Sequence, residues 1–341
     1  MSGVPREVTN GGSQRAHYVF SELARRTHAT QIERGGGRTL GAALLRQPSL
    51  FGSNLASAQL LRTRAWGAIR RAFRPGVLDL FDHPGLVLES IGVPLARGER
   101  ERLDAVIRSM VTGFEHVVVV SDGLAAMADV PIERRIVIPN GSDTSLIRPE
   151  PFPDAPVLGM VSGATPARGI EALIDAATEL RTSFPDLRVE LAVGKPSAPQ
   201  YESYARDLRD RAARLPWLTM RTVPYHELSA FLASASVLAV LLPPGAYWDI
   251  SLPVKLFDSM AAGRPVVATP RTEIASVVRA SGGGVVAASD TTHDVTAAFA
   301  DVLSDPARGR AMGARGRRAA ETEFDWHVLS SRIADTVLGA A

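Results

Sequence analysis

The most informative part of the sequence is Ser251-Leu-Pro-Val-Lys-Leu-Phe-Asp-Ser-Met-Ala-Ala-Gly-Arg-Pro-Val-Val267. Ser251 is a residue type that caps helices, and Pro253 suits a first helical turn, where its missing N–H costs little. Gly263 is a typical helix terminator, and Pro265-Val-Val267 can begin a strand. The stretch therefore predicts a helix that opens at Ser251, ends at Gly263 and leads into a buried strand.

The start of this helix carries two charged side chains on one face. Lys255 and Asp258 are three positions apart, which makes them neighbours on a helix surface. Unpaired N–H groups at a helix start attract anions, and Lys255 adds a full positive charge in the same turn. One interpretation is a phosphate at Lys255 with a pair of sugar hydroxyls at Asp258. The other is an ordinary surface ion pair, and the spacing alone leaves both open.

The C-terminal half alternates strands and helices. Apolar runs with little polar interruption predict strands buried on both faces at 157–163, 188–194, 237–242 and 265–269. Amphipathic stretches at 169–183 and 201–214 are long enough for crossover helices, and 294–338 predicts further helices, broken near Pro306 and Phe324. Repeated strand–helix–strand units of this kind imply a doubly wound parallel sheet in the α/β class.

The N-terminal half is less regular. Strands are predicted at 29–33, 77–82, 116–121 and 135–139, and helices at 13–26, 53–74 and 99–113. The segment 138–143, Ile-Pro-Asn-Gly-Ser-Asp, is a strand running into turn residues and predicts a domain boundary. We therefore expect Rossmann-like domains at 1–142 and 143–323 that face each other across a cleft, followed by a closing helix at 324–341.

Composition excludes several classes of protein. The chain has 341 residues, 45% of them hydrophobic and 22% charged, which is typical of globular domains. It contains no cysteine, so disulfides, thiolate nucleophiles and cysteine-ligated metals are excluded. A net charge of +2 is too small to indicate nucleic acid as a partner. No apolar run approaches the roughly 20 residues of a membrane span, which favours a cytoplasmic protein.

The block from Lys255 to Thr269 closely resembles the donor-binding segment of family 4 glycosyltransferases, which have the GT-B fold. Further segments resemble the same family in order and spacing. They are Gly11-Gly-Ser-Gln-Arg15, a glycine-rich loop; 138–143, an interdomain segment; Arg168-Gly-Ile170; Tyr225-His-Glu-Leu228; Asp305-Pro306; and Phe324-Asp-Trp326. In the family the last helix crosses back to the first domain.

The resemblance implies a retaining, metal-independent transferase that takes a sugar from a nucleoside-diphosphate sugar and needs no cofactor. Fixed cations and helix dipoles can stabilise the departing diphosphate. Arg168 would bind the diphosphate with Lys255, Asp258 would hold the ribose, and Gly12 would let the backbone approach the phosphates. The full donor-binding set implied is Gly11, Gly12, Arg168, Val223, Tyr225, Ser251, Leu252, Lys255 and Asp258.

Three departures from the family pattern stand out. The first of the family's paired glutamates falls on Ile250, beside Asp249, so the chain resembles the relatives with a Pro-x-Lys-Leu-x-Glu version, here ending in Asp258. The arginine that begins the family's phosphate site falls on Gly163. The segment 1–10 lacks the apolar pattern of the strand that normally opens a GT-B domain. We expect either a start codon placed too late or a first domain without that strand.

Acceptor-side candidates follow the predicted strand at 77–82. Asp82 or His83 could orient the acceptor or stabilise positive charge at the anomeric carbon, or could simply form a turn before Pro84. Basic and apolar residues fall on opposite faces of a predicted helix over 61–74. This helix could pack on the sheet or lie on an anionic membrane at its inner face, which would suit a lipid-linked acceptor.

The sequence therefore favours a glycosyltransferase that acts on a glycan, a lipid-linked or a small-molecule acceptor. A non-catalytic relative that binds nucleotide or a partner is the alternative, because Ile250 and Gly163 replace expected site residues. A UDP-sugar 2-epimerase shares the fold, but the additional carboxylates and histidines that it requires are not recognisable in the sequence.

Overall fold

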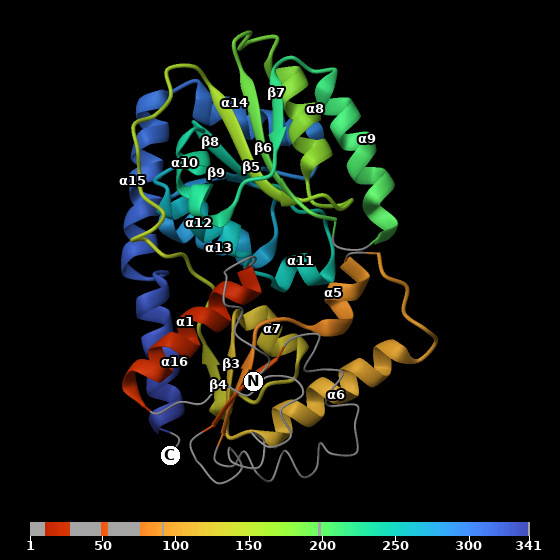
Figure 1. Cartoon of the computed structure of the whole chain (residues 1–341), viewed down its shortest axis with the longest axis vertical. Coiled ribbons are helices and arrows are strands. Elements are labelled where there is room, and N and C mark those ends of the chain that lie inside the picture. Colours follow the sequence, from red (N-terminus) through yellow and green to blue (C-terminus); the bar gives the residue numbers. More distant parts are fainter. Residues whose placement is uncertain (1–10, 28–48, 54–75, 91, 197–198, 340–341) are drawn as a thin grey trace. The chain divides into compact units, whose positions relative to one another are not determined.

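The computed structural model describes residues 11–27, 49–53, 76–90, 92–196 and 199–339 (Figure 1). The chain divides into two compact units. Unit 1 comprises Met1–Asn140, Ile250–Leu252 and Trp326–Ala341, and unit 2 comprises Gly141–Asp249 and Pro253–Asp325.

Unit 1 is built on a parallel sheet of the order β1-β2-β3-β4. Its strands are β1 (Ser49–Ser53), β2 (Gly76–Leu80), β3 (His116–Val119) and β4 (Arg135–Val137). Its helices are α1 (Gly11–Arg26), α5 (Pro84–Ser90), α6 (Glu99–Gly113), α7 (Asp122–Met127), the 3-10 turn η1 (Ile132–Arg134) and α16 (Trp326–Gly339). Strands β2 and β3 are mostly apolar, as expected for strands that are buried on both faces, and Asp79 is the charged exception in β2.

Helices α1 and α16 come from opposite ends of the chain and lie side by side (Figure 1). Tyr18 stacks on Trp326 with ring centroids 5.8 Å apart, and the indole N–H of Trp326 donates to Gln14 at 3.0 Å. The fully buried guanidinium of Arg15 pairs with Asp79 of β2 at 2.7 Å. Residues near both ends of the chain therefore complete the core of unit 1.

Unit 2 contains a six-stranded parallel sheet of the order β10-β9-β8-β5-β6-β7. Its strands are β5 (Val157–Gly163), β6 (Arg188–Gly194), β7 (Leu218–Arg221), β8 (Val237–Val240), β9 (Val266–Ala268) and β10 (Gly284–Val286). Its helices are α8 (Ile170–Leu180), α9 (Glu202–Ala213), α10 (Leu228–Ala233), α11 (Ala246–Ile250), α12 (Val254–Ala261), α13 (Thr272–Ser281), α14 (Thr292–Leu303) and α15 (Pro306–Thr322), with the 3-10 turns η2 (Pro199–Tyr201) and η3 (Tyr225–Glu227).

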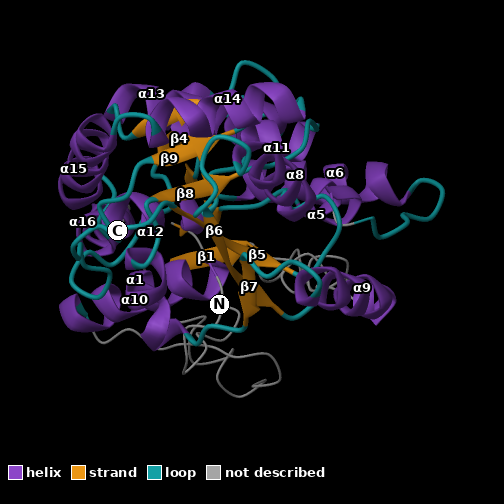
Figure 2. Ribbon diagram, turned by 90° about the horizontal axis from the view of Figure 1, so that it is seen from above, coloured by secondary structure: helices purple, strands orange, loops and turns teal. Residues whose placement is uncertain are grey.

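Helices cover both faces of this sheet, as Figure 2 shows from above. Helices α8, α9 and α14 lie on one face, and α10, α12 and α13 lie on the other. This layering follows from right-handed crossovers that run one way from β5 to β7 and the opposite way from β8 to β10. The order of the strands therefore reverses beside β5, and ligands of such sheets bind at the carboxyl ends of the strands near that reversal.

The predicted α/β class with parallel sheets is confirmed. The strands expected at 157–163 and 188–194 match β5 and β6 residue for residue. Strand β1 was not predicted, and α1 begins at Gly11, two residues before the predicted helix and within the predicted glycine-rich loop. The predictions for 1–10, 29–33 and 54–74 lie outside the described residues.

The predicted start of the helix at Ser251 is wrong. Helix α12 begins at Val254, and Pro253 precedes it with an extended ψ of 140°. The carbonyl oxygens of Ile250 and Leu252 accept hydrogen bonds from Ser121 at 2.6 Å and Asn140 at 2.8 Å in unit 1. The N-cap of α12 is therefore Pro253, and Ser251 lies between two carbonyl groups that are bonded within unit 1.

Candidate active site

Four strands of unit 2 are followed by candidate residues at the carboxyl edge of its sheet. Because all its strands are parallel, the residues that follow β5, β7, β8 and β9 lie along this one edge. Arg168 follows β5, Val223 follows β7, Trp248 follows β8, and Arg271 follows β9. Lys255 lies in the first turn of α12, between β8 and β9 in the chain. This edge of the sheet is therefore the candidate ligand-binding region of unit 2.

Arg168 is held at this edge by the turn that starts α8 and by an aromatic ring. Gly169 has a left-handed φ of +82° and directly precedes α8. The guanidinium carbon of Arg168 lies 4.8 Å from the centre of the Trp248 ring, which is itself buried. Stacking on an indole face limits the orientations of the guanidinium, so its N–H groups are directed before any ligand arrives.

Lys255 carries a positive charge in an unfavourable place. Although the residue as a whole is half-buried, burial of its ammonium and, to a smaller degree, the charge of Arg168 together lower the pKa of Lys255 to about 7. Among the residues that the structure describes, no carboxylate forms an ion pair with Lys255. A bound anion would stabilise the charged form of a buried lysine that lies beside a second cation. A diphosphate carries enough negative charge to do this.

Asp258, one turn after Lys255, faces a different partner. Its carboxylate is buried and accepts a hydrogen bond at 2.6 Å from the hydroxyl of Ser142, which is also buried. Asp258 is not among the groups that shift the pKa of Lys255. The surface ion pair considered from the spacing is therefore not formed.

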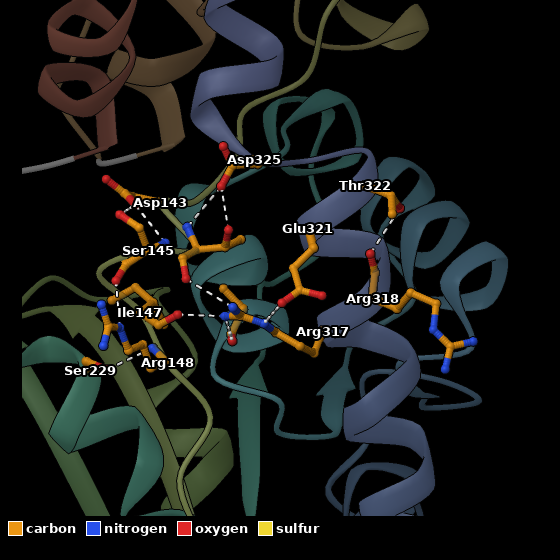
Figure 3. Close-up of polar contacts among 12 residues, drawn as sticks. Asp143, Ser145, Ile147, Arg148, Ser229, Arg317, Arg318, Glu321, Thr322 and Asp325 are labelled. Atoms are coloured by element: carbon orange, nitrogen blue, oxygen red, sulfur yellow. Dashed lines mark hydrogen bonds and ion pairs between the residues drawn. The ribbon is translucent and has the colours of Figure 1, made fainter.

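The residues 141–148, which we call the linker segment, are fixed to α15 (Figure 3). Arg317 donates to the carbonyl oxygens of Ile147 at 2.6 Å and Thr144 at 3.0 Å, and also to that of Ala261, at the end of α12, at 2.6 Å. The carboxylate of Asp325 accepts the N–H and the hydroxyl of Thr144. Arg317 of α15 thus connects the linker segment to the end of α12.

Neither Ile250 nor Asp249 takes the place of the first of the family's paired glutamates. Ile250 is buried and belongs to unit 1. Asp249 lies 3.6 Å from the guanidinium of Arg271, which also pairs with Asp290. Asp249 is therefore held by an arginine that the sequence did not single out.

The acceptor-side candidates lie in unit 1. The His83 ring is buried, its Nδ1 accepts from the N–H of Leu86 at 3.5 Å, and its Nε2 lies 3.4 Å from Asp104. Burial, followed by the charge of Arg100, lowers the pKa of His83, so the ring is neutral at pH 7. His83 lines a cavity of about 60 Å³, smaller than the roughly 300 Å³ of the smallest typical ligand sites. Asp82 is half-exposed beside it.

The structure brings together only part of the predicted set. Arg168, Val223, Tyr225, Lys255 and Asp258 belong to unit 2, where Tyr225 opens η3. The remaining candidates belong to unit 1 and are Gly11, Gly12, Asp82, His83, Ser251 and Leu252. Among the described residues, no group of three or more His, Asp or Glu side chains could hold a metal ion.

Sequence analysis missed Trp248, Ser142 and Arg271. The contact of Trp248 with Arg168 joins residues 80 positions apart, so no local pattern reveals it. Ser142 lay inside a quoted segment, where a serine next to an aspartate looks like turn chemistry. Arg271 could have been found from the sequence, because it closely follows the strand predicted at 265–269, and polar residues after parallel strands are common in binding sites.

Replacing Trp248 by leucine should weaken binding of inorganic pyrophosphate about tenfold, since a desolvated cation–π contact contributes up to about 2 kcal/mol. Replacing it by phenylalanine keeps an aromatic face and should retain most of the affinity. Calorimetry on both variants checks this, and equal affinities for the two would contradict a role for the ring in directing Arg168.

The fold is that of an α/β protein of the GT-B class, and unit 2 carries two cations, Arg168 and Lys255, at one edge of its sheet. Residues 155–305 match the family described as glycosyl transferases group 1. The resemblance to GT-B glycosyltransferases is thereby confirmed. The chain is 30% identical over 215 residues to the GDP-mannose-dependent α-(1-6)-phosphatidylinositol monomannoside mannosyltransferase of Mycolicibacterium smegmatis, covering 59% of this chain and 56% of that protein.

Other relatives support the same assignment. The chain is 27% identical over 268 residues to the D-inositol 3-phosphate glycosyltransferase of Thermobispora bispora, covering 71% of this chain and 61% of that protein. Among solved structures, WaaG, a glycosyltransferase of lipopolysaccharide biosynthesis, superposes with a TM-score of 0.66 at 14% identity over 98% of this chain and 97% of that one. The Anabaena HepE complex with UDP-glucose gives 0.67 at 18% identity, over 89% and 81%. The chain spans about half the length of the mannosyltransferase of Mycolicibacterium smegmatis and of its counterparts in Corynebacterium glutamicum and Mycobacterium tuberculosis.

Proposed function

We propose that the chain is a retaining, metal-independent glycosyltransferase that moves a sugar from a nucleoside-diphosphate sugar to an acceptor hydroxyl. The observation that carries the proposal is the pair of cations at one sheet edge, of which Lys255 has no carboxylate partner among the described residues. In the transfer, the bond between the anomeric carbon and the diphosphate breaks, and the acceptor oxygen bonds to that carbon. The acceptor proton passes to a diphosphate oxygen.

Arg168 and Lys255 would stabilise the negative charge that develops on the departing diphosphate. Preorganised charges in a dehydrated site are effective because they need no reorientation during the reaction. The backbone near Val223 and Tyr225 would bind the base. Asp82 and His83 stay candidates for the acceptor side, but both ring nitrogens of His83 face protein groups, so a general-acid role would require these contacts to open.

The names of the relatives narrow the proposed substrates. Mannosyltransferases named for GDP-mannose and for phosphatidylinositol mannosides favour a GDP-sugar as donor and an inositol-containing, lipid-linked acceptor. Such an acceptor would bring a cytoplasmic enzyme to the inner membrane face. None of the helices within the described ranges is long and apolar enough to cross a membrane, and the basic helix predicted over 61–74 is outside those ranges.

Thermal unfolding with GDP, UDP, ADP and TDP tests the donor, together with turnover assays on the matching sugars. A ligand at a hundredfold excess over its Kd stabilises the folded state by about 2.7 kcal/mol, so the preferred diphosphate should raise Tm by several degrees. We expect GDP to give the largest shift and GDP-mannose to be consumed. Binding without consumption of any donor would favour the non-catalytic alternative that Ile250 and Gly163 suggest. No shift with any nucleotide would refute the proposed function.

A further inference from the structure

Arg271 connects three segments at the carboxyl edge of the sheet in unit 2. It follows β9 and directly precedes α13. One nitrogen of its guanidinium donates to Asp290, which follows β10, and another lies 3.6 Å from Asp249 in α11, which follows β8. Because β10, β9 and β8 are neighbours in the sheet, one side chain ties together the ends of three adjacent strands.

Burial and pairing distinguish Arg271 from Arg168 and Lys255. Its side chain is only 6% exposed, and the two carboxylates beside it offset its charge. Its Nε is also buried and has no hydrogen-bond partner among the described residues, so this N–H is not presented to a ligand in solution. A buried guanidinium that is already paired in this way contributes to structure, because binding a diphosphate would require it to give up a carboxylate.

Helix α11, to which Arg271 is paired, is too short to be stable alone. It has five residues, and a helix of this length forms in a protein only when neighbouring groups fix it. Its residue Trp248 is buried, with its ring 4.8 Å from the guanidinium carbon of Arg168, and the next residue is Asp249. The ion pair with Arg271 therefore adds a fixed point directly beside the ring that directs Arg168.

We propose that Arg271 is a positioning residue, which fixes α11 through Asp249 and so keeps the Trp248 ring in place. The ring in turn directs Arg168. This deepens the proposed function, on which it rests for the identity of the anion that Arg168 binds. The alternative is that the charges of Arg271 and Asp249 act on the anion directly through space. The two roles predict opposite effects when the negative charge of Asp249 is removed.

The first test measures by calorimetry the affinity of Asp249→Asn for inorganic pyrophosphate, which has no sugar or base to contact. Removing a carboxylate near the cationic edge should by charge alone strengthen anion binding. We expect a loss of about three- to tenfold instead, because a released α11 lets the ring leave Arg168, and the full loss of the ring in Trp248→Leu is expected to cost about tenfold.

Asp175→Asn is the matched control for this substitution. Asp175 forms an exposed ion pair with Arg211 at 2.8 Å elsewhere in unit 2, so the same change there should leave the affinity for pyrophosphate unchanged. Equal or tighter binding by Asp249→Asn than by the wild type would overturn the proposal.

A double-mutant cycle tests whether Arg271 acts through the ring. Arg271→Met should weaken pyrophosphate binding about tenfold, and combining it with Trp248→Leu should cause no loss beyond that of Trp248→Leu alone. The same cycle with Asp249→Asn keeps Arg271 paired with Asp290, so it decides the question even if Arg271→Met does not fold. Losses that multiply would show that the charges act on the anion directly, and would overturn the proposal.

The last test needs no ligand, so its outcome is independent of the proposed function. The chain has only two lysines, Lys195 and Lys255, so NMR of protein labelled with 13C-lysine can follow each titration. Burial, and then the charge of Arg168, lower the pKa of Lys255, and because the two cations repel each other, a released Arg168 should move away.

In Asp249→Asn we therefore expect Lys255 to titrate about half a pH unit higher than in the wild type. Loss of the carboxylate charge alone would instead lower the pKa of Lys255, since a negative charge nearby favours the ammonium. Asp175→Asn should leave the titration unchanged. A lower or unchanged titration in Asp249→Asn would overturn the proposal, whether or not the protein binds pyrophosphate.

Discussion

Replacing Gly169 by alanine should destabilise unit 2 by about 2 to 5 kcal/mol, the largest effect on stability that we expect from a single methyl group. A Cβ at this position would lie 1.8 Å from the carbonyl oxygen of Leu241. The left-handed φ of +82° adds a backbone cost of roughly 1–2 kcal/mol for any residue with a side chain. Overpacking against a backbone that cannot move adds roughly 1–3 kcal/mol more.

Gly163→Ala is the matched control, because it inserts the same methyl group at the end of the preceding strand. The nearest atoms to a Cβ there are 3.9 Å away, which is ordinary contact. We expect a change within about 0.5 kcal/mol. The urea midpoint of the unit 2 transition, followed by circular dichroism, measures both. A midpoint for Gly169→Ala equal to that of Gly163→Ala would show that the turn before α8 can rearrange freely.

The Gly169 variant should also lose pyrophosphate binding. Arg168 precedes this glycine, and a displaced turn moves its guanidinium away from the Trp248 ring. The close approach of Gly169 to Leu241, which directly follows β8, thus determines the position of Arg168. A substitution at Gly169 should therefore change the stability of unit 2 and its affinity for pyrophosphate together.

The sequence predicted the parts of the fold that local pattern determines. The predicted bounds of β5 agree with the structure because Val157–Gly163 is a short and largely apolar run. Such a run is typical of a strand that is buried on both faces. Strand β1 was missed because Ser49–Ser53 reads Ser-Leu-Phe-Gly-Ser, with no β-branched residue. Helix α12 was started three residues too early because Ser251 and Pro253 form a good local start, whereas unit 1 binds the carbonyls on either side of Ser251.

The candidate site shows the same division. Arg168 and Lys255 could be found from sequence, because motif spacing places each relative to a strand end. The long-range contacts could not. Trp248 meets Arg168 across 80 positions of the chain, and Ser142 bonds to Asp258 across 116 positions. The buried pair of Arg15 and Asp79, 64 positions apart, was missed for the same reason.

Replacing Lys255 by methionine should weaken binding of the nucleoside diphosphate about a hundredfold at pH 7. The ammonium has no carboxylate partner among the described residues, so its interaction with a diphosphate is not offset by a lost ion pair. Losing a charge-assisted contact in a partly buried site commonly costs about 2–5 kcal/mol of affinity. Calorimetric titration of wild type and variant measures the difference, and equal Kd values would remove Lys255 from the site.

The pH dependence gives a second, independent measure of the same residue. Burial, and then Arg168, lower the pKa of Lys255 to about 7 in the free protein. A bound diphosphate favours the charged form and raises that pKa, so binding takes up a proton above pH 7. Affinity should therefore fall as pH rises, by about tenfold at pH 8 relative to the fully protonated site. Lys255→Arg is the reference protein, because its guanidinium stays charged over this pH range. Any pH dependence that comes from titration of the ligand's own phosphate groups is the same for both proteins and cancels in the comparison.

The stability of the free protein should change in the opposite direction over the same range. A lysine whose folded pKa lies below its unfolded value destabilises the folded state when charged, and this cost disappears as pH rises from about 7 toward 10.5. Wild-type Tm relative to that of Lys255→Met should therefore increase with pH, while diphosphate affinity decreases. If the relative Tm and the diphosphate affinity both decreased with rising pH, the ammonium would already be paired in the free protein. That result would contradict an anion site at this edge.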